Sequence, residues 1–163
     1  MDYIKIGKFQ GAHGLKGEIK FKSDFEYLDK VMTEGFHFYI GDSKEEELFL
    51  SSRPHKDYYL VLFKDINSIE DVEKYINKKV YILREDLNLD SNSYVLEDLL
   101  DKEVYFNDKL LGVISSINNY GGSNYIMEIS GSKEILIPYN SNFIDSVSDK
   151  VYLKDIEVFL NED

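Results

Sequence analysis

A glycine-punctuated stretch, residues 7–18, is the feature that most constrains how this chain can fold. Apolar and polar residues alternate on both sides of it, which is the pattern of half-buried β-strands. Glycines permit positive φ angles or close backbone approach, so the chain can turn sharply between these strands. The glycines of the turn are Gly11, Gly14 and Gly17. Three interpretations compete for this loop: a phosphate cradle, a partner-binding loop and a plain structural turn.

Short strand-like runs separated by turn residues recur along the rest of the chain. One helix of about two turns is predicted from Ile69 to Asn77, because Ser68 and Asp71 form a capping-box pattern ahead of it. Residues 25–31 suggest a turn or short helix, and Glu45-Glu46-Glu47 suggests a solvated turn. The expected strands after the opening pair are 36–40, 47–53, 58–64, 79–83, 103–106, 110–117, 125–129, 134–137, 151–153 and 156–160.

A stretch rich in Asp, Asn and Ser, residues 85–93, has the composition of a connector. The chain has 163 residues, which is enough for two small domains. We therefore predict a mainly β protein with two small β-barrel domains, residues 1–84 and 94–163, joined by this short linker, with one short helix in the first.

Charge is distributed unevenly. The net charge is -12, which repels nucleic-acid phosphates at long range and favours basic partners. Residues 1–87 carry 14 basic and 17 acidic side chains, whereas residues 88–163 carry 5 and 14, so the net charges of the halves are -3 and -9. Residues 1–22 have a local excess of lysine, so this end is the part best suited to meet phosphate. No stretch has the apolar length of a signal peptide or membrane span, so we expect a cytoplasmic protein that contacts no membrane.

Candidate catalytic groups are few. The glycine spacing lacks the dinucleotide fingerprint and the P-loop ending, and a strand rather than a helix follows it. The chain has no cysteine, and its three histidines form no HxxxH or HExxH pair. His37 is interpreted as a core or sheet-face histidine, His55 as a solvated turn residue, and His13 as a side chain that the glycines present outward. We therefore expect no enzyme activity, no cofactor and no metal.

A second candidate site is the segment from Tyr94 to Leu100, directly after the predicted linker. It carries more apolar side chains than a linker exit needs, so some of them belong to a core. Tyrosine beside an interdomain joint also suits a protein-binding patch, since tyrosine is enriched at interface hot spots. The two interpretations are equally supported by the residues alone.

These motifs together resemble the bacterial RimM family of ribosome maturation factors over essentially the whole chain. The N-terminal likeness runs from Ile6-Gly7-Lys8-Phe9 through Gly11-Ala12-His13-Gly14-Leu15-Lys16-Gly17-Glu18-Ile19-Lys20. The C-terminal likeness comprises Asp98-Leu99-Leu100, Leu111-Gly112-Val113, Gly121-Gly122, Lys133-Glu134-Ile135-Leu136-Ile137-Pro138-Tyr139 and the closing residues 151–158.

The resemblance implies a six-stranded N-terminal barrel like the second domain of translation elongation factors, followed by a PRC-barrel domain. It also implies a non-enzymatic factor that binds small-subunit ribosomal protein nineteen, acts on the immature small ribosomal subunit and promotes processing of its rRNA. Two positions depart from the family pattern. Val95 replaces the second of two consecutive tyrosines, and Asp101 stands where glycine commonly follows the Asp-Leu pair.

We therefore predict a monomeric assembly factor with two contact regions. The expected partner-binding residues are Tyr94, Val95, Leu96 and Asp98. The loop expected to face rRNA or a second protein contains Gly11, His13, Gly14, Lys16 and Gly17. A flavin- or nucleotide-binding barrel enzyme and a general RNA-binding β-barrel are the alternatives.

Overall fold

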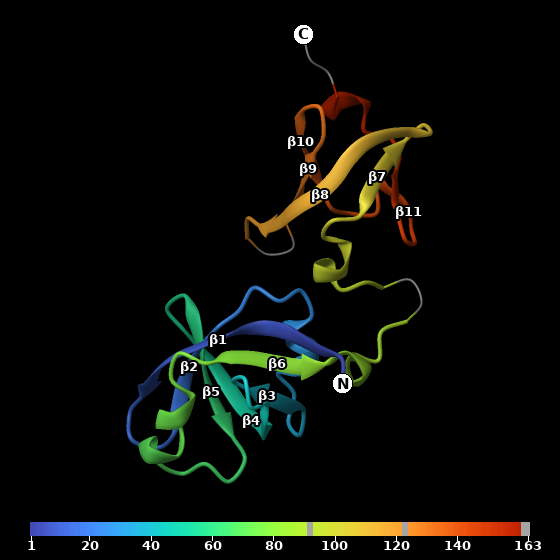
Figure 1. Ribbon diagram of the computed structural model, residues 1–163. Helices are drawn as coiled ribbons and strands as arrows, with labels where there is room; N and C mark the ends of the chain where they lie inside the picture. Colours follow the sequence, from blue (N-terminus) through green and yellow to red (C-terminus); the bar gives the residue numbers. More distant parts are fainter. Residues whose placement is uncertain (91–92, 122–123, 161–163) are drawn as a thin grey trace. The chain divides into compact units, whose positions relative to one another are not determined.

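The computed structural model of the chain divides into two compact units, Met1–Asp90 and Ser91–Asp163. It describes residues 1–90, 93–121 and 124–160 (Figure 1). Each unit is built around its own β-sheet, with few and short helices. The mainly β fold with two small sheet domains that the sequence predicts is therefore confirmed.

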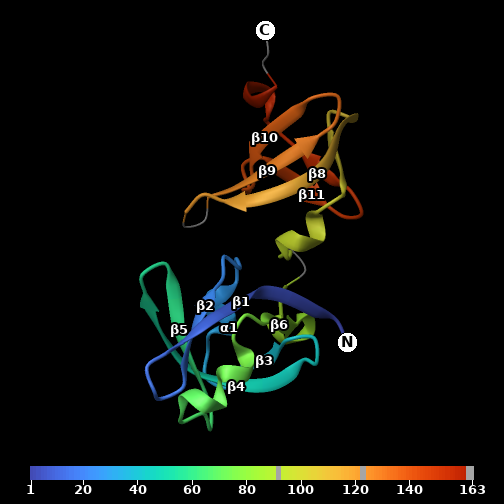
Figure 2. The same cartoon turned by 60° about the vertical axis from the view of Figure 1, so that its left-hand side comes forward.

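The first unit is a closed six-stranded barrel with the strand order β1-β2-β5-β4-β3-β6. The long strand β1 closes it, because its first half pairs antiparallel with β6 and its second half with β2. The β4–β5 hairpin extends away from the barrel wall in the views of Figures 1 and 2. The strands are β1 (Tyr3–His13), β2 (Glu18–Lys22), β3 (His37–Ile40), β4 (Glu45–His55), β5 (Tyr58–Phe63) and β6 (Lys79–Leu83).

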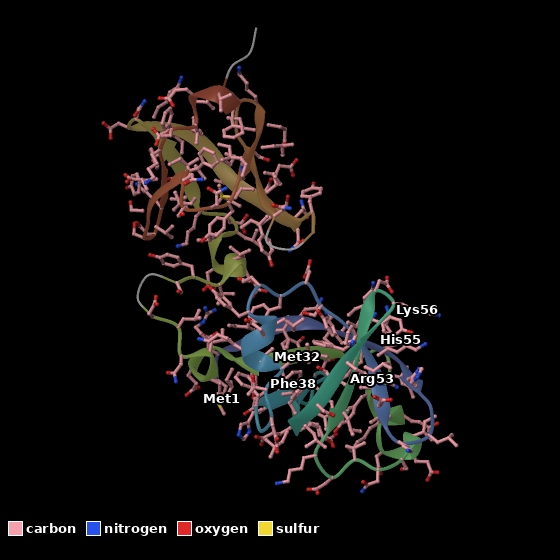
Figure 3. The ribbon with its side chains drawn as sticks, turned by 180° about the vertical axis from the view of Figure 1, so that it is seen from behind. Met1, Met32, Phe38, Arg53, His55 and Lys56 are labelled. Atoms are coloured by element: carbon pink, nitrogen blue, oxygen red, sulfur yellow. The ribbon has the colours of Figure 1, made fainter. Side chains whose placement is uncertain are left out.

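Aromatic rings fill the first barrel. Phe9 is fully buried, and its ring centroid lies 5.5 Å from that of Phe21, 5.8 Å from that of Phe63 and 6.4 Å from that of Tyr75. Phe38, labelled in Figure 3, is also fully buried and contacts the Phe21 and Phe63 rings. Edge-to-face ring pairs add to the free energy gained from burial, so this cluster stabilises the barrel.

The second unit is a six-stranded sheet with the order β10-β9-β8-β7-β12-β11. All neighbours are antiparallel except β7 and β12, which are parallel. Leu99, Ile114, Ile129 and Ile156 are fully buried in its core. Its elements are η4 (Leu96–Leu99), β7 (Glu103–Phe106), β8 (Lys109–Asn119), β9 (Tyr125–Ser130), β10 (Glu134–Pro138), β11 (Ile144–Val147), β12 (Val151–Leu153) and η5 (Glu157–Phe159).

Local structure differs from the sequence prediction in the helical segments. In place of the helix expected over Ile69–Asn77 there are two 3-10 turns, η1 (Ile69–Asp71) and η2 (Glu73–Tyr75). The α-helix of the first unit is instead α1 (Leu28–Val31), inside the stretch expected to be a turn or short helix. A helix of only about two turns is marginal by itself, so tertiary contacts of its apolar side chains decide its conformation.

In the second unit one strand prediction was wrong and one strand was missed. The run 156–160 forms the 3-10 turn η5 instead of a strand, and β11 was not predicted. Strand β11 has only two apolar residues and exists because β12 pairs with it, which its composition does not indicate.

The predicted acidic turn at Glu45-Glu46-Glu47 was also wrong, because these residues begin β4. Each carboxylate has a partner: Glu45 binds Lys74 at 2.6 Å, Glu46 contacts the exposed His37 imidazole, and Glu47 accepts a hydrogen bond from the buried Tyr75 hydroxyl. Burial raises the pKa of Glu47 and outweighs the opposing effect of the Tyr75 hydrogen bond. A strand here is stabilised by side chains that arrive from distant parts of the sequence.

The stretch between the two sheets begins with the 3-10 turn η3 (Arg84–Leu87). Leu87 is 1% exposed, and Asn88 ends the turn with a left-handed backbone. Ordered packing therefore extends three residues past the 84 boundary expected from composition. Among the residues that the structure describes, no helix is both long and apolar enough to span a membrane.

The glycine loop links β1 to β2 and is held against the 66–69 segment. Gly14 and Gly17 adopt φ values of +69° and +104°, and the Leu15 carbonyl accepts a 2.9 Å hydrogen bond from the Ile69 amide. A Cβ at Gly17 would lie 2.5 Å from Ile66 Cγ2, whereas a Cβ at Gly11 would meet nothing within 4 Å. Gly17 is thus required by the backbone and by packing, and Gly11 is not.

This difference yields a paired prediction. Gly17→Ala should lower the free energy of unfolding of the full chain by roughly 2 kcal/mol or more, since it adds both a disfavoured φ and a steric clash. Gly11→Ala should change it by no more than about 0.5 kcal/mol, because its backbone suits any residue. Urea unfolding monitored by far-ultraviolet circular dichroism measures both. Equal effects of the two substitutions would contradict this account of the loop.

Candidate functional site

The glycine loop places its predicted functional side chains at the surface of the first barrel. His13 is the last residue of β1 and is partly exposed, and Lys16 is exposed in the turn. Gly14 and Gly17 shape that turn, and Gly11 lies at a β-bulge between Phe9 and Ala12. The backbone therefore presents His13 and Lys16 outward.

A salt bridge connects the base of this loop to β4. The Arg53 guanidinium donates two hydrogen bonds to Glu18, from Nε to Oε2 at 3.0 Å and from Nη2 to Oε1 at 2.9 Å. These hydrogen bonds, together with the positive charge of Arg53, lower the pKa of Glu18 below its usual value. The charge of Glu18 is thus neutralised by a planar bidentate pair with Arg53.

His55 is a surface residue that the sequence did not assign to the site. It ends β4, and its imidazole centroid lies 5.0 Å from that of His13, with 54° between the ring planes. The sequence pattern predicts a solvated turn residue at this position, whereas the structure places His55 at the end of a strand. Its contact with His13 depends on the pairing β1-β2-β5-β4, which brings the ends of β1 and β4 together across two intervening strands. The residues around His13 and His55 in the sequence do not indicate this contact.

The loop's setting disfavours nucleotide binding of the familiar kinds. It joins two antiparallel strands, so no helix N-terminus follows it to hold a phosphate. Within the described ranges, no group of three or more His, Asp or Glu side chains is placed to hold a metal ion. A shallow surface hollow of about 320 Å³ lies elsewhere on the first unit, lined in part by Thr33, Phe36 and Asp86.

The second predicted site, Tyr94 to Leu100, is divided between core and surface. Val95 and Leu96 are only 2% and 8% exposed, so the two apolar residues expected to contact a partner lie inside the protein. Tyr94 is partly exposed, and its hydroxyl donates a 3.4 Å hydrogen bond to the Val147 carbonyl. Asp98 is exposed. The structure thus leaves Tyr94 and Asp98 at the surface and assigns Val95 and Leu96 to support them.

The turn after this segment explains the departure at Asp101. Asp101 has φ +69°, the left-handed region that glycine favours and that aspartate and asparagine tolerate better than other residues. Its amide donates a 2.8 Å hydrogen bond to the Ile114 carbonyl on β8. Aspartate at this position therefore keeps a turn of the kind that glycine would make. Leu100, immediately before it, is 40% exposed and widens the surface of the segment.

Both halves of the chain match models of known protein domain families. Residues 4–87 match the model of the RimM N-terminal domain, and residues 92–160 match that of the PRC-barrel domain. A ribosome maturation factor RimM of Lactobacillus johnsonii is 36% identical over 99% of this chain and 95% of its own length. One from Staphylococcus haemolyticus is 32% identical, with coverages of 88% and 89%.

A solved structure also aligns along most of the chain. It is the crystal structure of a 16S ribosomal RNA processing protein RimM of Pseudomonas aeruginosa, 22% identical, with a TM-score of 0.49 over 93% of this chain and 96% of that one. The family assignment rests on the two domain models and on the sequence identity to the Lactobacillus relative. On these grounds the chain belongs to the RimM family of ribosome maturation factors.

Proposed function

We propose that this protein is a non-enzymatic assembly factor of the small ribosomal subunit. In this proposal its second domain binds small-subunit ribosomal protein nineteen, and binding promotes maturation of the subunit and processing of its rRNA. Family membership supports the ribosomal role, and the net charge of -9 over residues 88–163 supports a basic partner for the second domain. We place this role in the cytoplasm and assign it to the monomer.

The proposed contact surface is the exposed side of the segment Tyr94 to Leu100. Its surface residues are the partly exposed Tyr94, the carboxylates of Glu97 and Asp98, and Leu100. Leu96 and Leu99 are buried in the core of the second domain and fix the orientation of η4. An aromatic and an aliphatic side chain flanked by carboxylates suit a basic protein, because burial gives affinity and complementary charge speeds encounter.

Val95 takes a supporting role in this proposal. The family commonly has a second tyrosine at this position, whereas valine here is 2% exposed. The aromatic contribution to binding then falls on Tyr94 alone, so this chain should be more sensitive to loss of Tyr94 than a relative with both tyrosines.

The first domain has a separate role in this proposal. The glycine loop, with Lys16 exposed in its turn and His13 at its base, contacts rRNA or a second protein of the subunit head. The local charge supports a contact of the glycine loop with RNA, because residues 1–22 carry five lysines and only two acidic side chains.

Tyr94→Ala tests the second-domain contact. We expect the dissociation constant for purified ribosomal protein nineteen to rise by about tenfold or more, as for an interface anchor, with no loss of folded structure. Tyr120→Ala is the matched control, since Tyr120 is a 67% exposed tyrosine of the same domain. Isothermal titration calorimetry measures both variants.

Ionic strength provides an independent check on this contact. Affinity of the wild-type protein should fall as salt rises from about 0.05 to 0.5 M, because screening weakens the attraction between an acidic domain and a basic partner. If the wild-type protein fails to bind at low salt, the assignment of this partner is wrong.

Lys16→Glu tests the first-domain contact. The substitution reverses a charge in the turn of the loop, where the side chain is exposed, so it should reduce co-sedimentation with immature small subunits several-fold while leaving the fold intact. Lys30→Glu on α1 reverses the charge of another exposed lysine of the same domain and serves as control. Unchanged co-sedimentation of the Lys16 variant would mean that the loop acts only as a turn.

A further inference from the structure

Four side chains from four different strands of the first barrel form a continuous surface cluster. His13 of β1 faces His55 of β4, the His55 ring lies 5.5 Å from Tyr58 of β5, and Lys20 Nζ of β2 lies 5.3 Å from the Tyr58 ring centroid. All four are partly exposed. We call His13, His55, Tyr58 and Lys20 the imidazole cluster.

The acidic groups beside this cluster are already neutralised. Glu18 is held by Arg53 in the bidentate pair, and Asp57, in the turn of the β4–β5 hairpin, is paired with Lys22 at the end of β2. Within the part of the chain that the structure describes, Lys16, Lys20 and Lys56 form no ion pair. The surface around the imidazole rings is therefore positive, in contrast to the chain as a whole.

The β4–β5 hairpin exposes part of this positive surface. Arg53, His55 and Lys56 lie together along the hairpin in Figure 3. Lys56 occupies the turn with φ +58° and is exposed, so its ammonium group is available to a ligand. Aromatic rings and cations thus lie together on one surface.

We propose that the imidazole cluster binds single-stranded RNA, with a base stacked on the exposed imidazole surface and the neighbouring phosphates bound by Lys16, Lys20 and Lys56. This inference rests on the proposed function and gives its first-domain contact a ligand class. Aromatic rings interleaved with cations are the arrangement by which proteins hold single strands, since every base has a face that can stack. An acidic protein segment would use the cations but would not need the rings.

The charge of the cluster depends on pH. Partial burial lowers the pKa of His55 below its usual value, and electrostatic interactions with His13, Lys56, Arg53 and Lys20 lower it further. This setting favours the neutral imidazole of His55 in the absence of a ligand. Bound phosphates supply the opposite charge, so RNA binding should favour the imidazolium form and take up protons. Affinity for RNA should then increase as the pH falls.

The test uses the full chain and a fluorescein-labelled oligoadenylate of about twelve nucleotides, a length within the range that single-strand sites cover. Anisotropy titrations at about pH 7.5 and about pH 5.5 bracket the ordinary histidine pKa. We expect the wild-type affinity to be several-fold higher at the lower pH. His55→Ala should weaken binding by about tenfold at the higher pH, as expected for loss of one stacked base. At the lower pH the loss should be larger, because the gain from protonating His55 is lost as well, so the pH dependence should be reduced.

Two further variants separate stacking from charge. His55→Phe keeps a ring but cannot be protonated, so it should retain most of the affinity at the higher pH and lose most of the gain at the lower one. His37→Ala removes an exposed imidazole of the same barrel that is paired with Glu46, and it should bind like the wild type. Circular dichroism establishes that each variant is folded.

Each outcome decides the proposal. If the wild-type protein binds the oligoadenylate no more tightly than a polyglutamate peptide of equal charge, the proposal is overturned in favour of an acidic-protein site. If the His55→Ala variant binds RNA like the wild type, the proposal is overturned outright. Binding to ribosomal protein nineteen, measured on the same variants, should remain unchanged. If the wild-type protein binds ribosomal protein nineteen but not the oligoadenylate, this inference is refuted and the second-domain proposal stands. If it binds the oligoadenylate but not ribosomal protein nineteen, the second-domain proposal is refuted and this inference stands.

Discussion

The first barrel depends on one strand, β1, that must pair on both sides. Residues 3–8 pair with β6 and residues 8–13 pair with β2, so the two pairings overlap at Lys8, and each contains a register shift. Gly7 directly precedes this overlap, and a Cβ on it would lie 2.3 Å from the Lys22 carbonyl oxygen and 2.7 Å from the Phe21 ring. Only glycine permits this approach, so barrel closure and the burial of Phe9 follow from it.

Closure also creates the surface on which both first-domain proposals rest. Because β1 must run the full height of the barrel to pair with β6 and then with β2, its last residue, His13, lies at the rim beside the β4–β5 hairpin. The glycine turn that follows is held by Gly17 against Ile66 and by the Leu15–Ile69 hydrogen bond. A rigid rim is what a binding surface needs, since pre-ordered side chains lose less entropy when a ligand binds.

The sequence predicted the elements that local pattern determines and missed those that distant partners determine. Strand β6 begins and ends where alternation predicts, at Lys79 and Leu83, and the glycine loop joins two strands as expected. The predicted 69–77 helix and 45–47 turn were wrong because these segments are held by partners far away in the sequence, Leu15 for the first and Lys74 and Tyr75 for the second. Strand β11 was missed because it depends on pairing with the adjacent β12, which its own composition does not indicate. Likewise the Tyr94 segment was located from sequence, but the burial of Val95 and Leu96 was not.

An acidic protein can present an RNA-binding surface if its positive and negative side chains are separated by more than the distance over which salt screens charge. At physiological ionic strength that distance is about 8 Å, so a phosphate at the imidazole cluster is governed by the side chains around it and little by the net charge of -12. The two ion pairs at Glu18 and Asp57 matter for this reason, because each places a cation directly against a carboxylate of the strands and turn that carry the cluster. The net charge of -9 over residues 88–163 favours a basic protein, so one chain can serve a polyanion and a polycation at separate surfaces.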